Sequence, residues 1–301
     1  MPTTIAGHAL QPLASELPRL YPITMVRAAI LTERSVISLE GIETRDFLQG
    51  LVTNDVMSCA GRKAMYAALL TPQGKILFDF FIAADGPVYF IDCAAKSAEE
   101  LARRLKFYRL RAKVTISSRP DLAVAAIWDA PSPIRAESIV EFADPRLGLL
   151  GTRLFGDKAR IETAIEQLAT GDFDEFRLQL GIPDSVDLPP DQVFALDAGL
   201  EELNGVSFSK GCYVGQEVTA RMKHRATARR RFFVAEADPI PAPGTSIEAQ
   251  GREVGKITSG KNGHGLALVR LDRVAEAEAN GLGFEANGQS IRLRRPEWLR
   301  V

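Results

Sequence analysis

The sequence has little of what metal sites and disulfide frameworks need. It contains three cysteines and three histidines in 301 residues. Cys59, Cys93 and Cys212 lie far apart without a C-x-x-C pair, and no histidine is spaced with another ligand. This pattern predicts neither disulfides nor a stable metal site of the protein's own, and it indicates a reducing compartment.

Long apolar runs and an excess of charge are also missing. No segment approaches the roughly 18 apolar residues of a membrane span, and the N-terminus lacks the pattern of a signal peptide. The net charge of −1 argues against a protein that depends on neutralising phosphate backbones. We therefore expect no membrane partner and no direct RNA binding, with a location in the cytoplasm of a bacterium or the mitochondrial matrix of a eukaryote.

The distribution of periodic segments predicts several domains. Residues 1–24 contain four prolines and no clear periodicity, which indicates a weakly packed extension. Strands and helices then alternate without a nucleotide-binding βαβ fingerprint, a pattern typical of α+β domains. From residue 229 onward, short strands separated by Gly, Pro and Asn turns predict a small β-barrel or sandwich.

The clearest local prediction is a hairpin. Residues 65–70 and 76–83 read as strands, and the segment 71–75 (TPQGK) places proline and glycine as in a β-turn. Asp79 interrupts the second strand, where an ionised carboxylate is costly to bury without a partner. It is either a functional group or an edge-strand charge that prevents aggregation. The apolar residues on both faces favour the functional interpretation.

The second distinctive stretch is residues 210–217 (KGCYVGQE), in which Cys212 lies between two glycines. An apolar run at 206–208 predicts a strand end, and four-residue spacing over 213–225 predicts a helix. Cys212 would then occupy a strand-to-helix turn, where Lys210 and the helix start lower the pKa of a thiol. The alternative is a tight turn around a buried structural cysteine.

Two basic segments are ambiguous. A helix over residues 97–109 carries four cations, Arg103, Arg104, Lys106 and Arg109, which we interpret as a solvated face. Residues 223–231 carry a second group that would suit a helix C-terminus, a ligand carboxylate or RNA phosphate.

Together these segments resemble the YgfZ-type folate-binding family, which is related to the glycine-cleavage T-protein, an aminomethyltransferase. The resemblance rests on the octapeptide 210–217, on residues 47–56 (FLQGLVTNDV) and on residues 71–75. Residues 204–208 and 219–221 bring the chain closest to the branch that contains the mitochondrial iron–sulfur assembly factor.

The resemblance implies an α+β fold of three domains, a cloverleaf around a central tetrahydrofolate pocket. Residues 25–40 and 120–228 would form the first domain, residues 41–119 the second, and residues 229–301 a C-terminal β-barrel.

The resemblance also implies a set of site residues. Asp79 and Tyr66 would face the folate, and Gln179 stands where the T-protein has a glutamate that grips the pterin. Arg221 and Arg225 are available for the carboxylate tail. The motif would supply Cys212 as a reactive thiol for a transient mixed disulfide, persulfide or cluster contact. Its members are Lys210, Gly211, Cys212, Tyr213, Gly215, Gln216 and Glu217.

The function that the resemblance implies is that of a tetrahydrofolate-binding accessory factor. It would assist iron–sulfur cluster assembly or repair in client enzymes, including those that modify tRNA, and its partners would be these enzymes and assembly proteins. The alternative is a folate-dependent aminomethyltransferase in which Asp79 is catalytic and Cys212 dispensable. An RNA-binding module built on residues 223–231 is a third, least favoured hypothesis.

Overall fold

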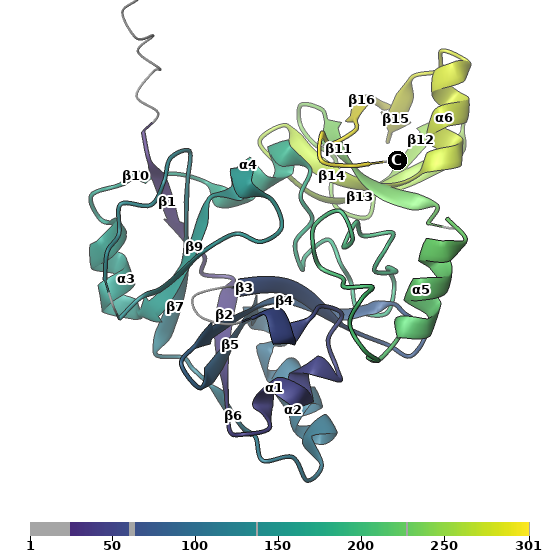
Figure 1. Cartoon of the computed structure of the whole chain (residues 1–301). Helices are drawn as coiled ribbons and strands as arrows, with labels where there is room; N and C mark the ends of the chain where they lie inside the picture. Colours follow the sequence, from purple (N-terminus) through teal and green to yellow (C-terminus); the bar gives the residue numbers. More distant parts are fainter. Residues whose placement is uncertain (1–24, 60–63, 137, 227, 301) are drawn as a thin grey trace, which may run out of the picture.

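The computed structural model describes residues 25–59, 64–136, 138–226 and 228–300. These residues form two five-stranded sheets and one closed barrel, arranged as three lobes (Figure 1). The expectation of an N-terminal extension concerns residues 1–24, which lie outside this part of the chain.

One sheet contains the predicted hairpin. Its strand order is β3 (Ala64–Leu70), β4 (Ile76–Asp85), β5 (Val88–Ala94), β2 (Arg34–Glu40) and β6 (Thr115–Ser118). The hairpin is confirmed, with the Thr71 amide donating to the Lys75 carbonyl at 2.8 Å. Helices α1 (Thr44–Gln49) and α2 (Ala98–Arg109) cover one face of the sheet, with short 3-10 turns at Val56–Ser58 and Ala95–Ser97.

The placement of β2 corrects the expected domain boundary at residue 40. β2 pairs with β5 and β6, for example Ile37 with Ile91, so residues 34–40 belong to the sheet of the second domain. The residues between β1 and β2 therefore carry the chain from one lobe to the next. Sequence periodicity showed the strands here but not which partners they would choose.

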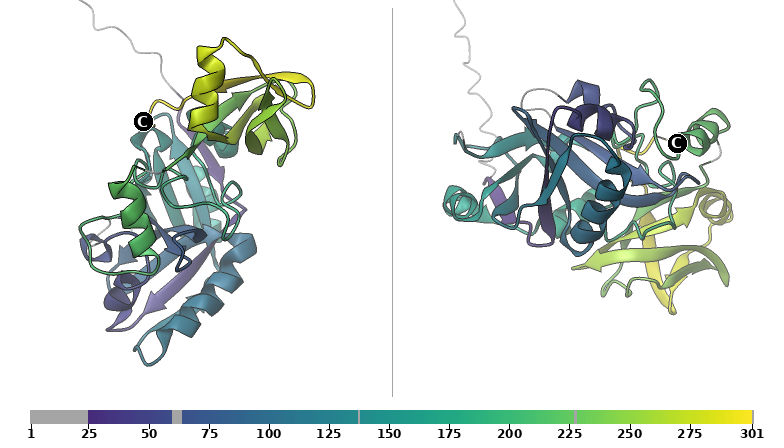
Figure 2. Two further views of the ribbon diagram at one scale, coloured as in Figure 1. Left: turned by 90° about the vertical axis from the view of Figure 1, so that its right-hand side faces the viewer. Right: turned by 90° about the horizontal axis from the view of Figure 1, so that it is seen from below.

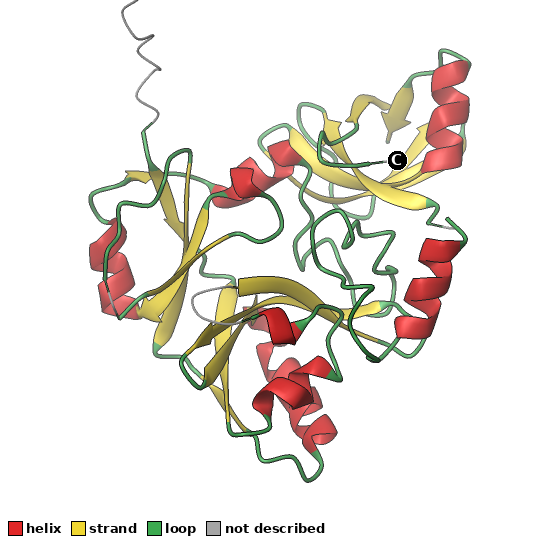
Figure 3. Cartoon of the chain, in the orientation of Figure 1, coloured by secondary structure: helices red, strands yellow, loops and turns green. Residues whose placement is uncertain are grey.

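The other open sheet has the order β10 (Ala169–Thr170), β1 (Arg27–Ile30), β7 (Leu122–Trp128), β9 (Thr152–Asp157) and β8 (Val140–Ala143). A 3-10 turn at Gly148–Leu150 precedes β9, and α3 (Lys158–Ile165) packs against β7 and β9. Helix α4 (Phe173–Leu180) then leads toward the barrel (Figure 3).

The C-terminal barrel is confirmed. Its closed order is β11 (Arg230–Glu236), β14 (His264–Arg270), β13 (Arg252–Lys261), β12 (Ser246–Ala249), β15 (Phe284–Ala286) and β16 (Gln289–Arg294). Closure removes the exposed edges that such short strands would otherwise present. Helix α6 (Leu271–Ala279) lies beside it.

The three lobes share one apolar core. It includes Tyr66 and Phe81 from the hairpin, Trp128 from β7, and Phe232 and Leu266 from the barrel. The segment from residue 181 to α5 (Gln216–His224) has no strand or helix and runs through the middle of the molecule (Figures 2 and 3). Pro183, Pro189 and Pro190 disfavour regular structure in its first part, and the segment lies where all lobes meet.

Candidate functional site

Asp79 lies inside the molecule, on the face of β4 that looks toward the other lobes. The hydroxyl of Tyr66 donates to Asp79 Oδ2 at 3.0 Å, and the hydroxyl of Ser185 donates to Oδ1 at 2.6 Å. Asp79 is only 4% exposed, and β4 is paired on both sides. The alternative of an edge-strand charge is therefore wrong.

The environment of this carboxyl raises its pKa. Burial is the main cause, and repulsion from Asp184 adds to it, against the opposing influence of Arg34. Burial also raises the pKa of Tyr66, so its phenol remains a hydrogen-bond donor. Burial works in the same direction on Asp184, but Arg34 and other guanidiniums hold the pKa of that carboxyl well below its usual range. The site thus pairs a weak acid with a permanent carboxylate.

A network of buried ion pairs surrounds Asp79 and Asp184. Arg34 contacts Asp92 at 2.7 Å and Asp184 at 3.0 Å, and Arg153 contacts Asp92 at 2.6 Å. Arg146 completes the group through Asp144 at 2.9 Å. Because charges are costly to bury alone, each member depends on its partners remaining in place.

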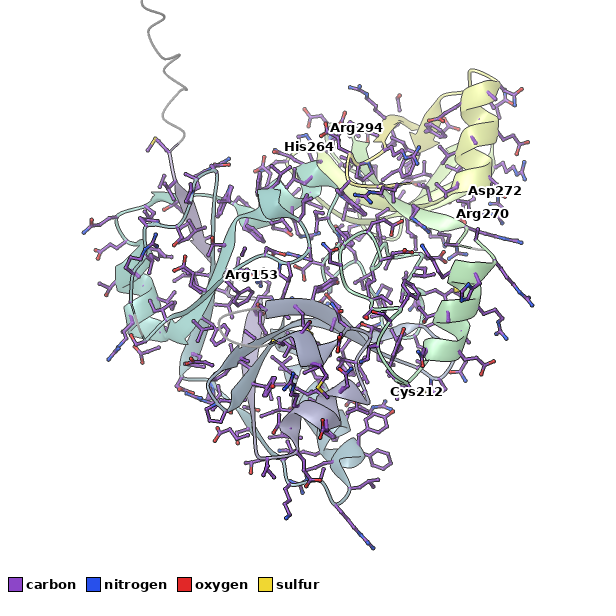
Figure 4. The ribbon with its side chains drawn as sticks, viewed as in Figure 1. Arg153, Cys212, His264, Arg270, Asp272 and Arg294 are labelled. Carbon is purple, nitrogen blue, oxygen red and sulfur yellow. The ribbon has the colours of Figure 1, made fainter. Side chains whose placement is uncertain are left out.

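Phe81 is the apolar centre of this network. The guanidiniums of Arg34, Arg146 and Arg153 lie 5.6, 4.8 and 4.2 Å from its ring centroid, within the range of cation–π attraction. Figure 4 shows Arg153 between the two sheets. The charges therefore join the lobes: Arg153 comes from β9, whereas Phe81 comes from β4.

A cavity of about 540 Å³ lies next to this network. Its polar lining includes Arg34, Asp184 and Ser185, with Asp79 directly behind the serine hydroxyl. The rest of the lining combines apolar residues, two further acids and three further cations: Leu31, Ala94, Ala95, Phe173, Val186, Glu33, Asp174, Lys96, Arg177 and Lys261. The cavity offers carboxylates inside, apolar sides and exposed lysines at its mouth.

Three residues expected to hold folate lie elsewhere. Gln179 is exposed and pairs with Glu175 on α4, because the buried face of that helix carries Arg177 and Leu178 instead. Arg221 and Arg225 are exposed on α5, and neither lines the cavity. Their expected role at the ligand tail stays a prediction, and the cations of this cavity come from other elements.

The motif forms a loop on a different part of the surface. Cys212 is exposed, as Figure 4 shows below α5. The expected strand at residues 206–208 is absent, and α5 begins at Gln216 rather than near Tyr213. Cys212 is therefore four residues ahead of the helix, and the prediction that it occupies the helix start is wrong. The alternative of a buried structural cysteine is also wrong.

Lys210 anchors this loop. Its ammonium donates to the carbonyls of Gln49, Val52 and Asn54 at 2.8, 2.6 and 2.8 Å, and it lies over the Tyr213 ring. Burial lowers the pKa of Lys210 to about 8. All three ammonium hydrogens are directed at carbonyls, so Lys210 is a structural anchor of the motif and does not hydrogen-bond the thiol.

The remaining motif residues have different environments. Tyr213 is buried, whereas Gly211 and Glu217 are exposed. Gly215 has φ +83° and caps α5, and a Cβ there would lie 2.6 Å from the Thr71 carbonyl oxygen. Gln216 is half-buried at the first position of the helix.

Asn54 joins the segments 47–56, 204–208 and 210–217, which carry part of the family resemblance. The side-chain amide of Asn54 donates to the backbone carbonyls of Tyr66 and Asn204 at 2.8 and 2.7 Å, and the backbone carbonyl of Asn54 accepts from the Lys210 ammonium. Gly215 packs on the tip of the hairpin. A continuous set of contacts thus runs from the loop of Cys212 through Asn54 and Tyr66 to Asp79.

Sequence reasoning missed most of the central charges. The signal used for Asp79, a charge within an apolar strand, also marks Asp92 in β5 and Arg153 in β9. Asp184 and Ser185 carried no such signal, because they lie in the irregular segment. In the parts of the chain that the structure describes, no group of three or more His, Cys, Asp or Glu side chains could hold a metal ion.

Comparisons with known proteins agree with this architecture. Residues 229–301 match the family model described as CAF17, C-terminal beta-barrel domain. The iron–sulfur cluster assembly factor IBA57, mitochondrial, of Mus musculus is 32% identical over 277 residues, which cover 81% of this chain and 77% of the relative. The chain belongs to the IBA57 family. The human member is 33% identical over 275 residues, with the same coverage.

The IBA57-family chain also has a known fold. The glycine cleavage system aminomethyltransferase T from Bartonella henselae superposes with a TM-score of 0.72 at 14% identity, covering 92% of this chain and 87% of that one. These findings confirm the T-protein-like fold and the resemblance to the branch of the mitochondrial assembly factor. No helix among the described residues is long and apolar enough to cross a membrane.

Proposed function

We propose that this IBA57-family protein is an iron–sulfur cluster assembly factor that presents Cys212 to a cluster on a partner protein. The setting of the thiol carries the proposal: Cys212 is exposed, while Lys210 and Tyr213 beside it are held by carbonyls and by burial. A thiol on a fixed loop can meet a partner at little cost in conformational entropy.

One thiolate is too few ligands for a cluster. Clusters of the common types are held by four cysteine thiolates, whereas Cys59 and Cys93 are buried. We therefore propose that Cys212 supplies a single ligand after releasing its proton to solvent. Assembly proteins or client enzymes, including tRNA-modifying ones, supply the others, and the cluster is cargo.

We further propose that the cavity beside Ser185 binds a reduced folate. Asp184 in the lining suits the N–H groups of a pterin, with Asp79 behind it supporting Ser185, and apolar Leu31 and Phe173 suit the rings. The exposed Lys96 suits an anionic tail, in place of Arg221 and Arg225, whereas Lys261 already pairs with Asp172. A bound folate would supply one-carbon chemistry. The residues of the chain would bind and orient it.

Cellular complementation tests the role of the thiol. In cells that lack the protein, Cys212→Ser should fail to restore the activity of iron–sulfur enzymes. Gly211→Ala is the matched control, because a Cβ on Gly211 meets nothing within 4 Å. Full complementation by folded Cys212→Ser would disprove the proposed role.

Calorimetric titration with tetrahydrofolate tests the ligand separately. Wild type should bind, and Lys96→Met should bind about tenfold more weakly if the contact with the anionic tail is lost. If wild type does not bind tetrahydrofolate, the proposal of a folate site is disproved, whereas the proposed role of the thiol is unaffected. If Asp79→Asn alone abolished cellular function and Cys212→Ser did not, aminomethyl transfer would become the better explanation.

A further inference from the structure

One protruding end of the molecule combines apolar and basic side chains. We name it the α2 tip: residues 41–43 after β2, and residues 103–113 at the end of α2 and in the following turn. It forms the lower extremity in Figure 1 and in the left view of Figure 2. The two turns are joined, because the Lys113 amide donates to Glu43 Oε2 at 2.7 Å. A Cβ on Gly41 would lie 2.0 Å from the Lys113 carbonyl oxygen.

The tip holds the three most exposed large apolar side chains of the described residues. Ile42 is 89% exposed, Leu110 85% and Phe107 73%. Elsewhere, strongly exposed large apolar residues occur singly, as is normal for a soluble surface. Three such side chains at one extremity indicate a surface that contacts an apolar partner.

Six cations occur in the same segment as Phe107 and Leu110. Residues 103–113 contain no acidic side chain, although the whole chain has a net charge of −1. The cations are Arg103, Arg104, Lys106, Arg109, Arg111 and Lys113. Of these, Arg103 forms an ion pair, with Glu100; the described structure gives the other five no carboxylate partner. The nearby acids on these elements are Glu43, Glu99 and Glu100.

The backbone holds one apolar side chain in an unfavourable conformation. Leu110 has φ +47°, a region that favours glycine and disfavours branched or bulky residues. A hydrophobic residue that is both exposed and strained stabilises neither the core nor the turn. Such strain is found where a side chain is held for another role.

We propose that the α2 tip docks on an anionic lipid bilayer. Ile42, Phe107 and Leu110 would enter the boundary between headgroups and acyl chains, while the cations of the tip meet lipid phosphates. The tip protrudes from the rest of the molecule, so it suits a soft planar surface. This proposal departs from two expectations drawn from sequence: that the basic residues of α2 form a solvated face and that the protein has no membrane partner.

Other occupants fit the tip less well. Protein interfaces are depleted of lysine and of charge at their centres. Recognition of single-stranded RNA uses stacking platforms rather than protruding aliphatic side chains. Neither of these occupants explains why exposed Ile42 and Leu110 occur together with six cations.

Co-sedimentation of the full chain with vesicles tests the proposal. Wild type should bind phosphatidylcholine vesicles that contain phosphatidylglycerol, bind pure phosphatidylcholine much more weakly, and dissociate as salt is raised. Leu110→Gly should weaken binding about tenfold by removing an inserted side chain. It should not lower thermal stability, since glycine relieves the positive φ.

Two further variants complete the experiment. Arg111→Ala should weaken binding about fivefold through loss of one charge near the surface. Leu149→Ser, at an exposed leucine outside the tip, is the matched control and should bind as wild type.

Several results would overturn the proposal. Failure of wild type to bind anionic vesicles would do so, and so would equal binding to neutral ones. Concentration-dependent self-association that Leu110→Gly abolishes would assign the tip to a protein interface instead. A tRNA mobility shift that the tip variants abolish, without vesicle binding, would assign it to RNA.

Discussion

At the residue scale, Asp79 combines a buried carboxyl with two hydroxyl donors and no cation at ion-pair distance. Because burial raises its pKa, the folded state retains a proton that the unfolded chain has already released. Folding stability from this group therefore falls as pH rises from its ordinary value through the folded-state value. A strong acid such as Asp184, whose pKa is lowered, has the opposite dependence.

Asp79→Asn tests this directly. The amide cannot ionise, and the Tyr66 and Ser185 hydroxyls can rotate to pair with it. We expect the free energy of unfolding near neutral pH to rise by about 1 kcal/mol and its decline with pH to flatten. Urea denaturation across the acid-to-neutral range measures both. Asp85→Asn, at the exposed end of the same strand, is the control; an unchanged pH slope in Asp79→Asn would contradict the expectation.

At the scale of elements, the motif loop is held by contacts with the β3–β4 hairpin rather than by its own secondary structure. Gly215 has a positive φ, and a Cβ there would approach both Thr71 and Leu70. Gly211, four residues earlier, faces open space. Packing therefore requires a glycine at position 215 of the motif but not at position 211.

Gly215→Ala should therefore destabilise the protein by about 2–4 kcal/mol, through left-handed strain and overpacking. Gly211→Ala should change stability by less than about 0.5 kcal/mol. Chemical denaturation measures the difference, and the rate of iodoacetamide labelling reports on Cys212 in each variant. Equal stability of the two variants would show that the hairpin does not hold the loop.

The prediction from sequence was accurate for this hairpin and for most strands of the barrel, because alternation and turn residues are local signals. It showed neither β15 nor α6. It failed for the start of α5. Tyr213 and Val214 fit the helical spacing, but Tyr213 is buried in the loop, and Gly215 in a left-handed conformation delays the helix to Gln216. Tertiary packing overrode the local pattern.

At the scale of the whole molecule, buried ion pairs join the lobes. Arg153 on β9 reaches Asp92 on β5, and Arg34 on β2 reaches Asp184 in the central irregular segment. A buried ion pair contributes little net stability, but removing one partner leaves the other charge buried and unpaired.

Arg153→Met should accordingly lower the free energy of unfolding by about 3–5 kcal/mol. Arg119→Met, which removes an exposed pair with Asp121, should cost less than about 1 kcal/mol. A double variant with Asp92→Asn should be less destabilised than the sum of the single changes. Additive effects would show that Arg153 and Asp92 do not act together.

The sequence by itself determined the hairpin over residues 65–83, most of the short strands after residue 229 and the exceptional character of residues 210–217. These follow from periodicity, turn chemistry and register, which act over a few residues, or from a motif written in consecutive positions. Only the tertiary structure decided that β2 joins the second lobe, that Lys210 anchors rather than activates, and that Arg34, Asp184 and Ser185 surround Asp79. Those outcomes depend on contacts between residues up to 161 positions apart, and no local pattern specifies which distant charges will be buried together.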